Sequence, residues 1–200
     1  MKNCFNIEKM RNMFIEYTYF KIIVINSMIY LAFSLGIKMV DYFSLYPDLS
    51  KFIFSPWTIL TFMFFHESFL FLVINMILLF FFGRELEKII SSKKFLTIYV
   101  ISSIVGGTVI LLLSPLIYLS YPINGAAISV FAIIGTLAWL RPELNIFGVN
   151  ITQVVFVSAV LNVLTFLMMF QTSGLSSISN LTGLGIGIFY GRVFEKQTKK

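Results

Sequence analysis

His66 is the only histidine of this 200-residue chain, and Glu67 follows it directly. Hydrolysis by a serine requires a base within hydrogen-bond reach of the attacking hydroxyl, so any Ser-His pair must use His66. A Ser-Lys pair is unpromising, because the apolar segments that follow His66 contain no lysine. A metal needs several ligands, and few candidates lie near His66. The single cysteine, Cys4, cannot form an intramolecular disulfide or a thiolate cluster. These residues predict no metal site and no cofactor.

The apolar composition indicates that lipid is part of the solvent of this chain. Hydrophobic residues make up 58% of it and charged residues 12%, whereas a soluble domain carries about 25% charged residues. Residues 95–140 and 144–191 contain no charge at all. Each of these segments is long enough for two membrane crossings of about 20 residues and a turn. The composition therefore predicts a multi-pass integral membrane protein.

Apolar segments along the chain predict an all-α bundle of six transmembrane helices. They cover residues 20–40, 66–83, 95–113, 125–140, 150–170 and 177–193. Residues 57–65 are also apolar but too short to cross a membrane. We expect these nine residues to form a re-entrant or interfacial segment.

Basic residues are concentrated on one side of the predicted bundle. With the N-terminus in the cytoplasm, the outer segments hold only Lys38 and Lys51, and nearly all other lysines and arginines are inside. By the positive-inside rule both termini are cytoplasmic, most simply at the cell membrane. This asymmetry accounts for the net charge of +6 without a nucleic-acid partner.

The predicted domain organisation has three parts. Residues 1–19 form a cytoplasmic segment whose apolar spacing fits either an amphipathic helix or a solvated tail. Residues 20–195 form the membrane domain, and residues 196–200 form a basic cytoplasmic tail.

Glycines recur every four residues in the last apolar segment, at Gly183, Gly187 and Gly191, with Gly185 between them. Such a row of small residues lets another helix approach closely. The segment 125–140 offers small residues of its own. We therefore expect these two helices to pack tightly together.

Four stretches, in order along the chain, resemble the rhomboid family of intramembrane serine proteases. They are residues 56–66, 75–88, 124–135 and 180–187. With the number of spans and their orientation, the resemblance covers roughly residues 20–195. It implies a six-helix rhomboid bundle. In such a bundle a serine on the fourth span is the nucleophile and a histidine on the sixth is its base. A histidine and an asparagine on the second span hold the oxyanion.

The chain departs from this pattern at the positions of the catalytic residues. The nucleophile position is Ala127, which has no hydroxyl, and the base position is Asn180, which takes no proton near neutral pH. Of the two oxyanion positions, one is Phe71 and the other, Asn75, matches the family. The resemblance therefore implies no catalytic residue at these four positions, which would instead line a cavity.

The neighbouring residues are expected to have structural roles. Ile128 replaces the glycine that follows the nucleophile in the family. Ser129, the nearest other hydroxyl, lies about 200° round a helix from residue 127, so it is predicted to pack between helices. The resemblance implies that His66 braces the outer loop and that Gly125, Gly183 and Gly187 are structural.

Three functions are compatible with the sequence. The favoured one is a rhomboid-like membrane protein without proteolytic activity, a pseudoprotease. It would bind transmembrane helices of single-span or polytopic clients between its second and fifth spans, with membrane lipid as its other partner. The first alternative is an active intramembrane serine endopeptidase with an unrecognised site. The second is a small transporter, although the last four segments offer the polar Gln153 and Asn162 and no charge at mid-membrane.

Overall fold

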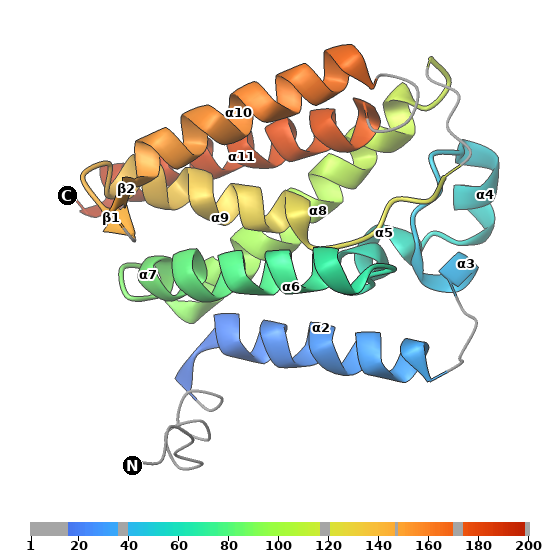
Figure 1. Ribbon diagram of the computed structural model, residues 1–200, viewed down its shortest axis with the longest axis horizontal. Helices are drawn as coiled ribbons and strands as arrows, with labels where there is room; N and C mark the ends of the chain where they lie inside the picture. Colours follow the sequence, from blue (N-terminus) through green and yellow to red (C-terminus); the bar gives the residue numbers. More distant parts are fainter. Residues whose placement is uncertain (1–15, 36–39, 117–120, 147, 170–173, 199–200) are drawn as a thin grey trace.

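The computed structural model describes residues 16–35, 40–116, 121–146, 148–169 and 174–198. Most of the segment 1–19 therefore lies outside the described residues, as do Cys4, Lys38 and the last two residues of the tail. Figure 1 shows that the described residues are mostly helical. The long helices are α2 (Thr18–Ser34), α6 (Phe69–Leu78), α8 (Ser92–Leu113), α9 (Ala127–Leu140), α10 (Ile151–Met168) and α11 (Gly174–Thr198).

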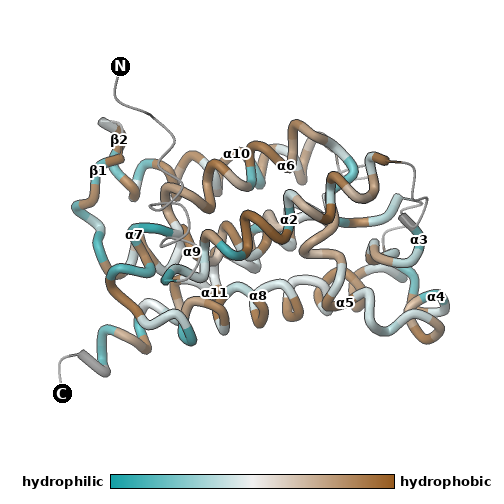
Figure 2. The backbone as a smooth tube through the Cα atoms, turned by 90° about the horizontal axis from the view of Figure 1, so that it is seen from below, coloured by the Kyte–Doolittle hydropathy of each residue, from teal (hydrophilic) through white to brown (hydrophobic). Residues whose placement is uncertain are grey.

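Several of these helices suit a membrane. Among the described residues, three helical segments are long and apolar enough to cross one, at 69–87, 92–113 and 151–168, while α2 and α9 are shorter apolar helices. Figure 2 shows mainly hydrophobic colours along the helices, with hydrophilic residues near α7 at one end and near α3 and α4 at the other. The predicted all-α membrane fold is confirmed. The count of six spans and the sides of the termini stay predictions.

Several helix bounds differ from the predicted spans for local reasons. Helix α2 ends at Ser34, well before residue 40. The second span begins at Phe69, because the backbone of Ser68 is extended and does not continue a helix toward His66. The span then runs from α6 through a π-helical turn, Leu79–Gly83, into α7 (Arg84–Glu87). Helix α10 begins after Asn150, which forms a capping box with Gln153.

Short helices and strands lie at both ends of the bundle. Between α2 and α6 lie α3 (Val40–Phe43), α4 (Leu49–Phe54), α5 (Thr58–Thr61) and a 3₁₀ turn, Phe62–Phe64. We call this end, made of residues 40–68 and 121–126, the loop end. A bridge between Leu45 and Ile123 ties its two parts together. At the opposite end, the hairpin end, β1 (Asn145–Ile146) pairs antiparallel with β2 (Val149–Asn150) next to α7.

Helix α9 lies between the α6–α7 segment and the α10–α11 pair, and α2 lies on the far side of α6 (Figure 1). A Cβ atom built on Gly187 would be 2.1 Å from the carbonyl oxygen of Ala132, and one on Gly183 would be 2.3 Å from that of Ile128. Only glycine permits this approach, so the predicted tight packing of the two helices is confirmed. Gly185 faces open space and takes no part in the contact.

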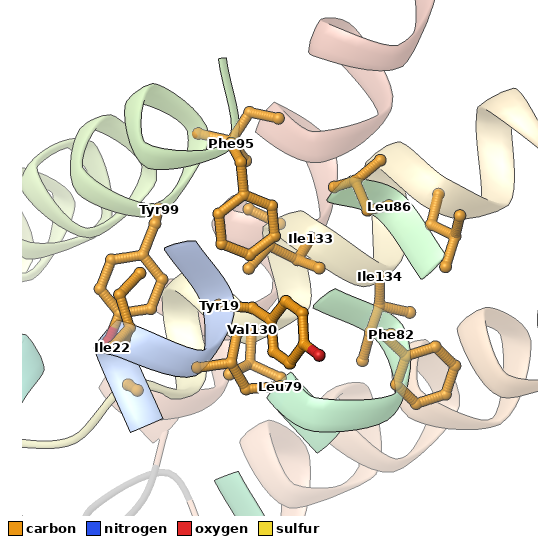
Figure 3. Close-up of a cluster of buried hydrophobic side chains, with 14 of the residues drawn as sticks. Tyr19, Ile22, Leu79, Phe82, Leu86, Phe95, Tyr99, Val130, Ile133 and Ile134 are labelled. Carbon is orange, nitrogen blue, oxygen red and sulfur yellow. The ribbon is translucent and has the colours of Figure 1, made fainter. Parts of the chain in front are cut away.

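The largest buried cluster joins α2, α6 and its continuation, α8 and α9. Figure 3 shows Tyr19 and Phe95 packed with Leu79 and Ile133 in this cluster. Beside it, the buried carboxylate of Glu87 accepts the backbone N–H groups of Thr18 and Tyr19, at 2.8 and 2.9 Å. A carboxylate at a helix N-terminus satisfies the first amides and the helix dipole, so Glu87 anchors the start of α2.

Candidate functional site

A cavity of about 350 Å³ lies at the loop end, where α6, α9 and α11 come together. Its lining includes all four residues predicted from the sequence to share a cavity, namely Phe71, Asn75, Ala127 and Asn180. They come from three helices that lie far apart in the sequence. The α9–α11 packing described above holds two of these helices together at fixed register.

The four side chains differ in how they meet the cavity. Asn75 is 8% exposed, whereas Phe71 is 64% exposed and reaches the surface of the bundle. Ala127 is the first residue of α9 and offers only a methyl group. The side-chain amide of Asn180 donates a 3.1 Å hydrogen bond to the side-chain oxygen of Asn162 on α10. Asn180, which the sequence resemblance places at the base position, thus ties two helices together.

His66 is buried in the wall of the cavity, and its Nε2 already has hydrogen-bond partners. Its Nε2 accepts the backbone N–H of Ala126 at 3.2 Å and lies 3.4 Å from the side-chain amide nitrogen of Asn75. Gly125, with a φ of +102°, turns the chain just before α9, and a Cβ built there would be 3.4 Å from the ring. His66 therefore holds the segment that leads into α9.

Burial also makes His66 a poor base. It lowers the pKa of the imidazole from 6.5 to about 4, and the backbone of Phe64 opposes this shift only in part. The ring is neutral at pH 7. Because an N–H donates to its Nε2, the proton of the neutral ring is on Nδ1.

Ser129 is placed as a packing residue. Its side chain is fully buried, lies 2.7 Å from the hydroxyl of Ser103 on α8, and donates to the carbonyl of Tyr99. It does not line the cavity that Ala127 lines. The prediction that Ser129 faces away from residue 127 is confirmed.

Sequence reasoning missed the serines that do line the cavity, Ser68, Ser176 and Ser179. Ser176 precedes Asn180 by one helical turn, and that spacing was the available signal. Ser179 donates to the carbonyl of Leu175 at 2.9 Å. Within the described part of the chain, none of the three is hydrogen-bonded to His66. The cavity therefore contains hydroxyls that are not hydrogen-bonded to His66, although His66 and Glu67 also line it.

Metal ligands are not grouped in the described part of the chain. Among the described residues, no three His, Cys, Asp or Glu side chains lie close enough together to hold a metal ion.

Gln153 and Asn162, two polar residues of the fifth predicted span, both have structural partners. Gln153 accepts from the backbone of Asn150, and Asn162 donates to the carbonyl of Ser158 and accepts from Asn180.

Comparison with known proteins agrees with this geometry. No individual curated protein matched the chain. A model of the rhomboid domain matches residues 54–197, which include every helix that lines the cavity and exclude α2. The match is therefore narrower at its start than the residues 20–195 covered by the sequence resemblance. It still spans well over half of the chain, and the chain belongs to the rhomboid family.

Proposed function

We propose that this rhomboid protein does not cleave peptide bonds and instead binds transmembrane helices of client membrane proteins in the cell membrane. The observation that carries the proposal is the content of the cavity. Ala127 and Asn180 stand where the family has its nucleophile and base, and Nε2 of His66, the only histidine, accepts a backbone N–H.

The chemistry of acyl transfer explains why this content matters. A serine becomes a nucleophile when an adjacent base removes its proton, and the base in turn needs a free lone pair. Asn180 has no basic nitrogen. To act as a base, His66 would have to lose the hydrogen bond from the Ala126 N–H and its contact with the Asn75 amide. Even then, its low pKa makes it a weak base. An active endopeptidase would need a base from elsewhere in the chain.

The same cavity offers contacts to a helix in lipid. Two helices present large, exposed apolar side chains. On α6 these are Phe71 (64% exposed) and Ile74 (44%), and on α10 they are Phe156 (70%) and Leu164 (46%). Deeper in the cavity, Asn75 presents an amide, and such groups hydrogen-bond across helices in membranes. A client helix could therefore pack on exposed apolar side chains such as Phe71, which lines the cavity, and place a polar group inside.

The transporter alternative has less support. Mid-membrane polar groups in transporters face a substrate path. Here Gln153 caps the start of α10, and Asn162 is hydrogen-bonded to Asn180 and Ser158. Both residues that suggested transport are thus accounted for by structural contacts.

The first experiment tests cleavage. The purified protein is treated with a fluorophosphonate serine probe and with a rhomboid-type transmembrane substrate, beside the triple variant Ala127→Ser, Asn180→His, Phe71→His. We expect neither labelling nor cleavage by the unchanged chain. Activity of the unchanged chain that is lost in His66→Gln or Ser176→Ala would show a protease and overturn the proposal. Activity gained by the triple variant would show that the family's catalytic geometry is preserved.

The second experiment tests binding. A photo-crosslinking residue replaces Phe71, and a matched variant carries it at Met28 of α2, which is equally exposed at 64%. The two proteins are reconstituted with a single-span helix that contains one mid-membrane asparagine. We expect crosslinks from position 71 that exceed those from position 28 by about tenfold, and lose that excess in Asn75→Leu. Equal crosslinking from both positions would show nonspecific contact in the bilayer.

A further inference from the structure

A second cavity, of about 390 Å³, lies inside the loop between α2 and α6. Its walls come from residues 41–58 and share no residue with the cavity that holds Ala127. Its volume falls within the range of about 300–1,000 Å³ that is typical of small-molecule sites. The proposed binding of client helices does not involve this second cavity, which we call the loop cavity.

The loop cavity places opposite charges on either side of one tyrosine. The hydroxyl of Tyr46 donates to the carboxylate of Asp41, and the ammonium of Lys51 lies 4.0 Å from the centroid of the Tyr46 ring. In the described part of the chain, no carboxylate lies within salt-bridge distance of Lys51. The cavity thus presents an anion and a cation that both contact Tyr46, which complements a small zwitterion.

Two hydroxyls line the inner wall of the loop cavity. Ser44 and Thr58 are buried, at 0% and 3% exposed. The Ser44 hydroxyl accepts the side-chain amide of Asn124 at 3.3 Å, and Thr58 donates to the carbonyl of Ser55 at 2.7 Å. These bonds fix the wall, and its oxygens offer a polar group hydrogen-bond partners beside the apolar Phe52 and Phe54.

The surface around the loop cavity suits the boundary between membrane and water. Leu49, Ile53 and Phe54 on α4 are exposed, the last two at 72% and 82%. Trp57 stacks on Tyr42 and donates its indole N–H to the Tyr42 carbonyl at 2.8 Å. Tryptophan and tyrosine are enriched where lipid head groups meet the hydrocarbon. The cavity therefore opens where a lipid can place its head group inside and its acyl chains against the apolar side chains.

We propose that the loop cavity binds the head group of a phosphatidylethanolamine from the surrounding membrane, with the phosphate at Lys51 and the ammonium at Asp41. Ethanolamine phosphate is a compact zwitterion whose ammonium has N–H groups that a carboxylate accepts. A choline head group has no N–H to donate. A purely anionic head group meets Asp41, Asp48 and Glu67 at this end, where Lys51 is the only lysine or arginine among the described residues.

The test measures lipid binding by the purified full-length protein. Delipidated protein in detergent is titrated with phosphatidylethanolamine, phosphatidylcholine or phosphatidylglycerol of identical acyl chains, and bound lipid is counted by native mass spectrometry. We expect phosphatidylethanolamine to bind at least tenfold more tightly than the other two. Lys51→Gln and Asp41→Asn should each weaken its binding about tenfold, and the matched variant Lys93→Gln, exposed at the hairpin end, should not.

Two further outcomes decide the source and the selectivity. Soluble phosphoethanolamine, which lacks acyl chains, should not displace the lipid at equal concentration. If the soluble compound binds as tightly as the lipid, the occupant is a soluble zwitterion and the lipid proposal is wrong. If the three lipids bind alike, or if Lys51→Gln and Asp41→Asn bind phosphatidylethanolamine as Lys93→Gln does, the loop cavity is not a head-group site.

Discussion

At the residue scale, the proposed lack of proteolysis depends mainly on Asn180 and His66. The sequence resemblance places Asn180 at the position of the base, and His66 is the only histidine of the chain. Asn180 is hydrogen-bonded to Asn162, and His66 is hydrogen-bonded to the backbone of Ala126. Both side chains thus help to hold helices and loops in position.

Acid should destabilise the protein through His66. The pKa of the folded imidazole, about 4, is below the value of 6.5 expected in the unfolded chain, so the unfolded state binds the proton more readily. Stability is then full above pH 6.5 and falls as the pH drops toward 4, by about 3 kcal/mol in total. The measurement is thermal unfolding in detergent between pH 4 and pH 8. His66→Gln should lose most of this dependence, and an identical slope in that variant would contradict the prediction.

The hydrogen bond between Asn162 and Asn180 should contribute modestly to stability. Measured hydrogen bonds between membrane helices average about 0.6 kcal/mol, so a double-mutant cycle of Asn162→Ala and Asn180→Ala should give a coupling of that size. Unfolding in a denaturing detergent measures it. The matched cycle of Thr165→Ala with Asn180→Ala should be additive, because Thr165 bonds within its own helix. Additivity in both cycles would show that the pair contributes nothing.

At the scale of elements, the contact of α9 with α11 positions the cavity. The two helices approach so closely that backbone carbonyls of α9 meet glycines of α11. Thr136 on α9 adds a hydrogen bond to the carbonyl of Gly187, at 2.9 Å. Helix α10 is different, since Ile151 is its only buried residue among those described. A rigid pair of helices therefore carries Ala127 and Asn180, while one exposed helix borders them.

A methyl group at Gly187 should push this pair apart. The Cβ of Gly187→Ala would overlap the Ala132 carbonyl, and overpacking of this kind costs about 1–3 kcal/mol. The control is Gly185→Ala on the same helix, which meets no atom within 4 Å and should be neutral or slightly stabilising. Denaturing-detergent titration of both variants measures the difference. Equal stability of the two would mean that the helices are not in this register.

At the scale of the whole molecule, the prediction concerns which end of the bundle lies on which side of the membrane. From the positive-inside rule we predict that the loop end lies outside the cell and the hairpin end in the cytoplasm. In a Cys4→Ser background, Tyr121→Cys reports the loop end and Glu143→Cys the hairpin end, since both side chains are exposed. A membrane-impermeant thiol reagent added to intact cells should label position 121, and position 143 only after permeabilisation. The opposite pattern would invert the topology.

The sequence alone determined the class of protein and the residue types on which the proposed lack of proteolysis rests. An apolar composition with long uncharged segments specifies membrane helices, because the length that lipid requires is a local property. The absence of a nucleophile and of a base at Ala127 and Asn180 is a matter of residue identity. The tight packing at Gly183 and Gly187 followed from their spacing of four, because a helix brings such residues to one face.

The tertiary structure decided which partners these residues meet. The hydrogen bond of Asn180 to Asn162 joins residues 18 positions apart, and that of His66 to Ala126 joins residues 60 positions apart. Glu87 accepts from two residues at the start of α2 that are 69 and 68 positions away. Such contacts depend on how each helix is rotated and tilted against its neighbours. That arrangement is set by the sum of many packing contacts, so no local pattern in the sequence contains it. The two cavities at the loop end follow from the same arrangement, and so only the folded molecule reveals them.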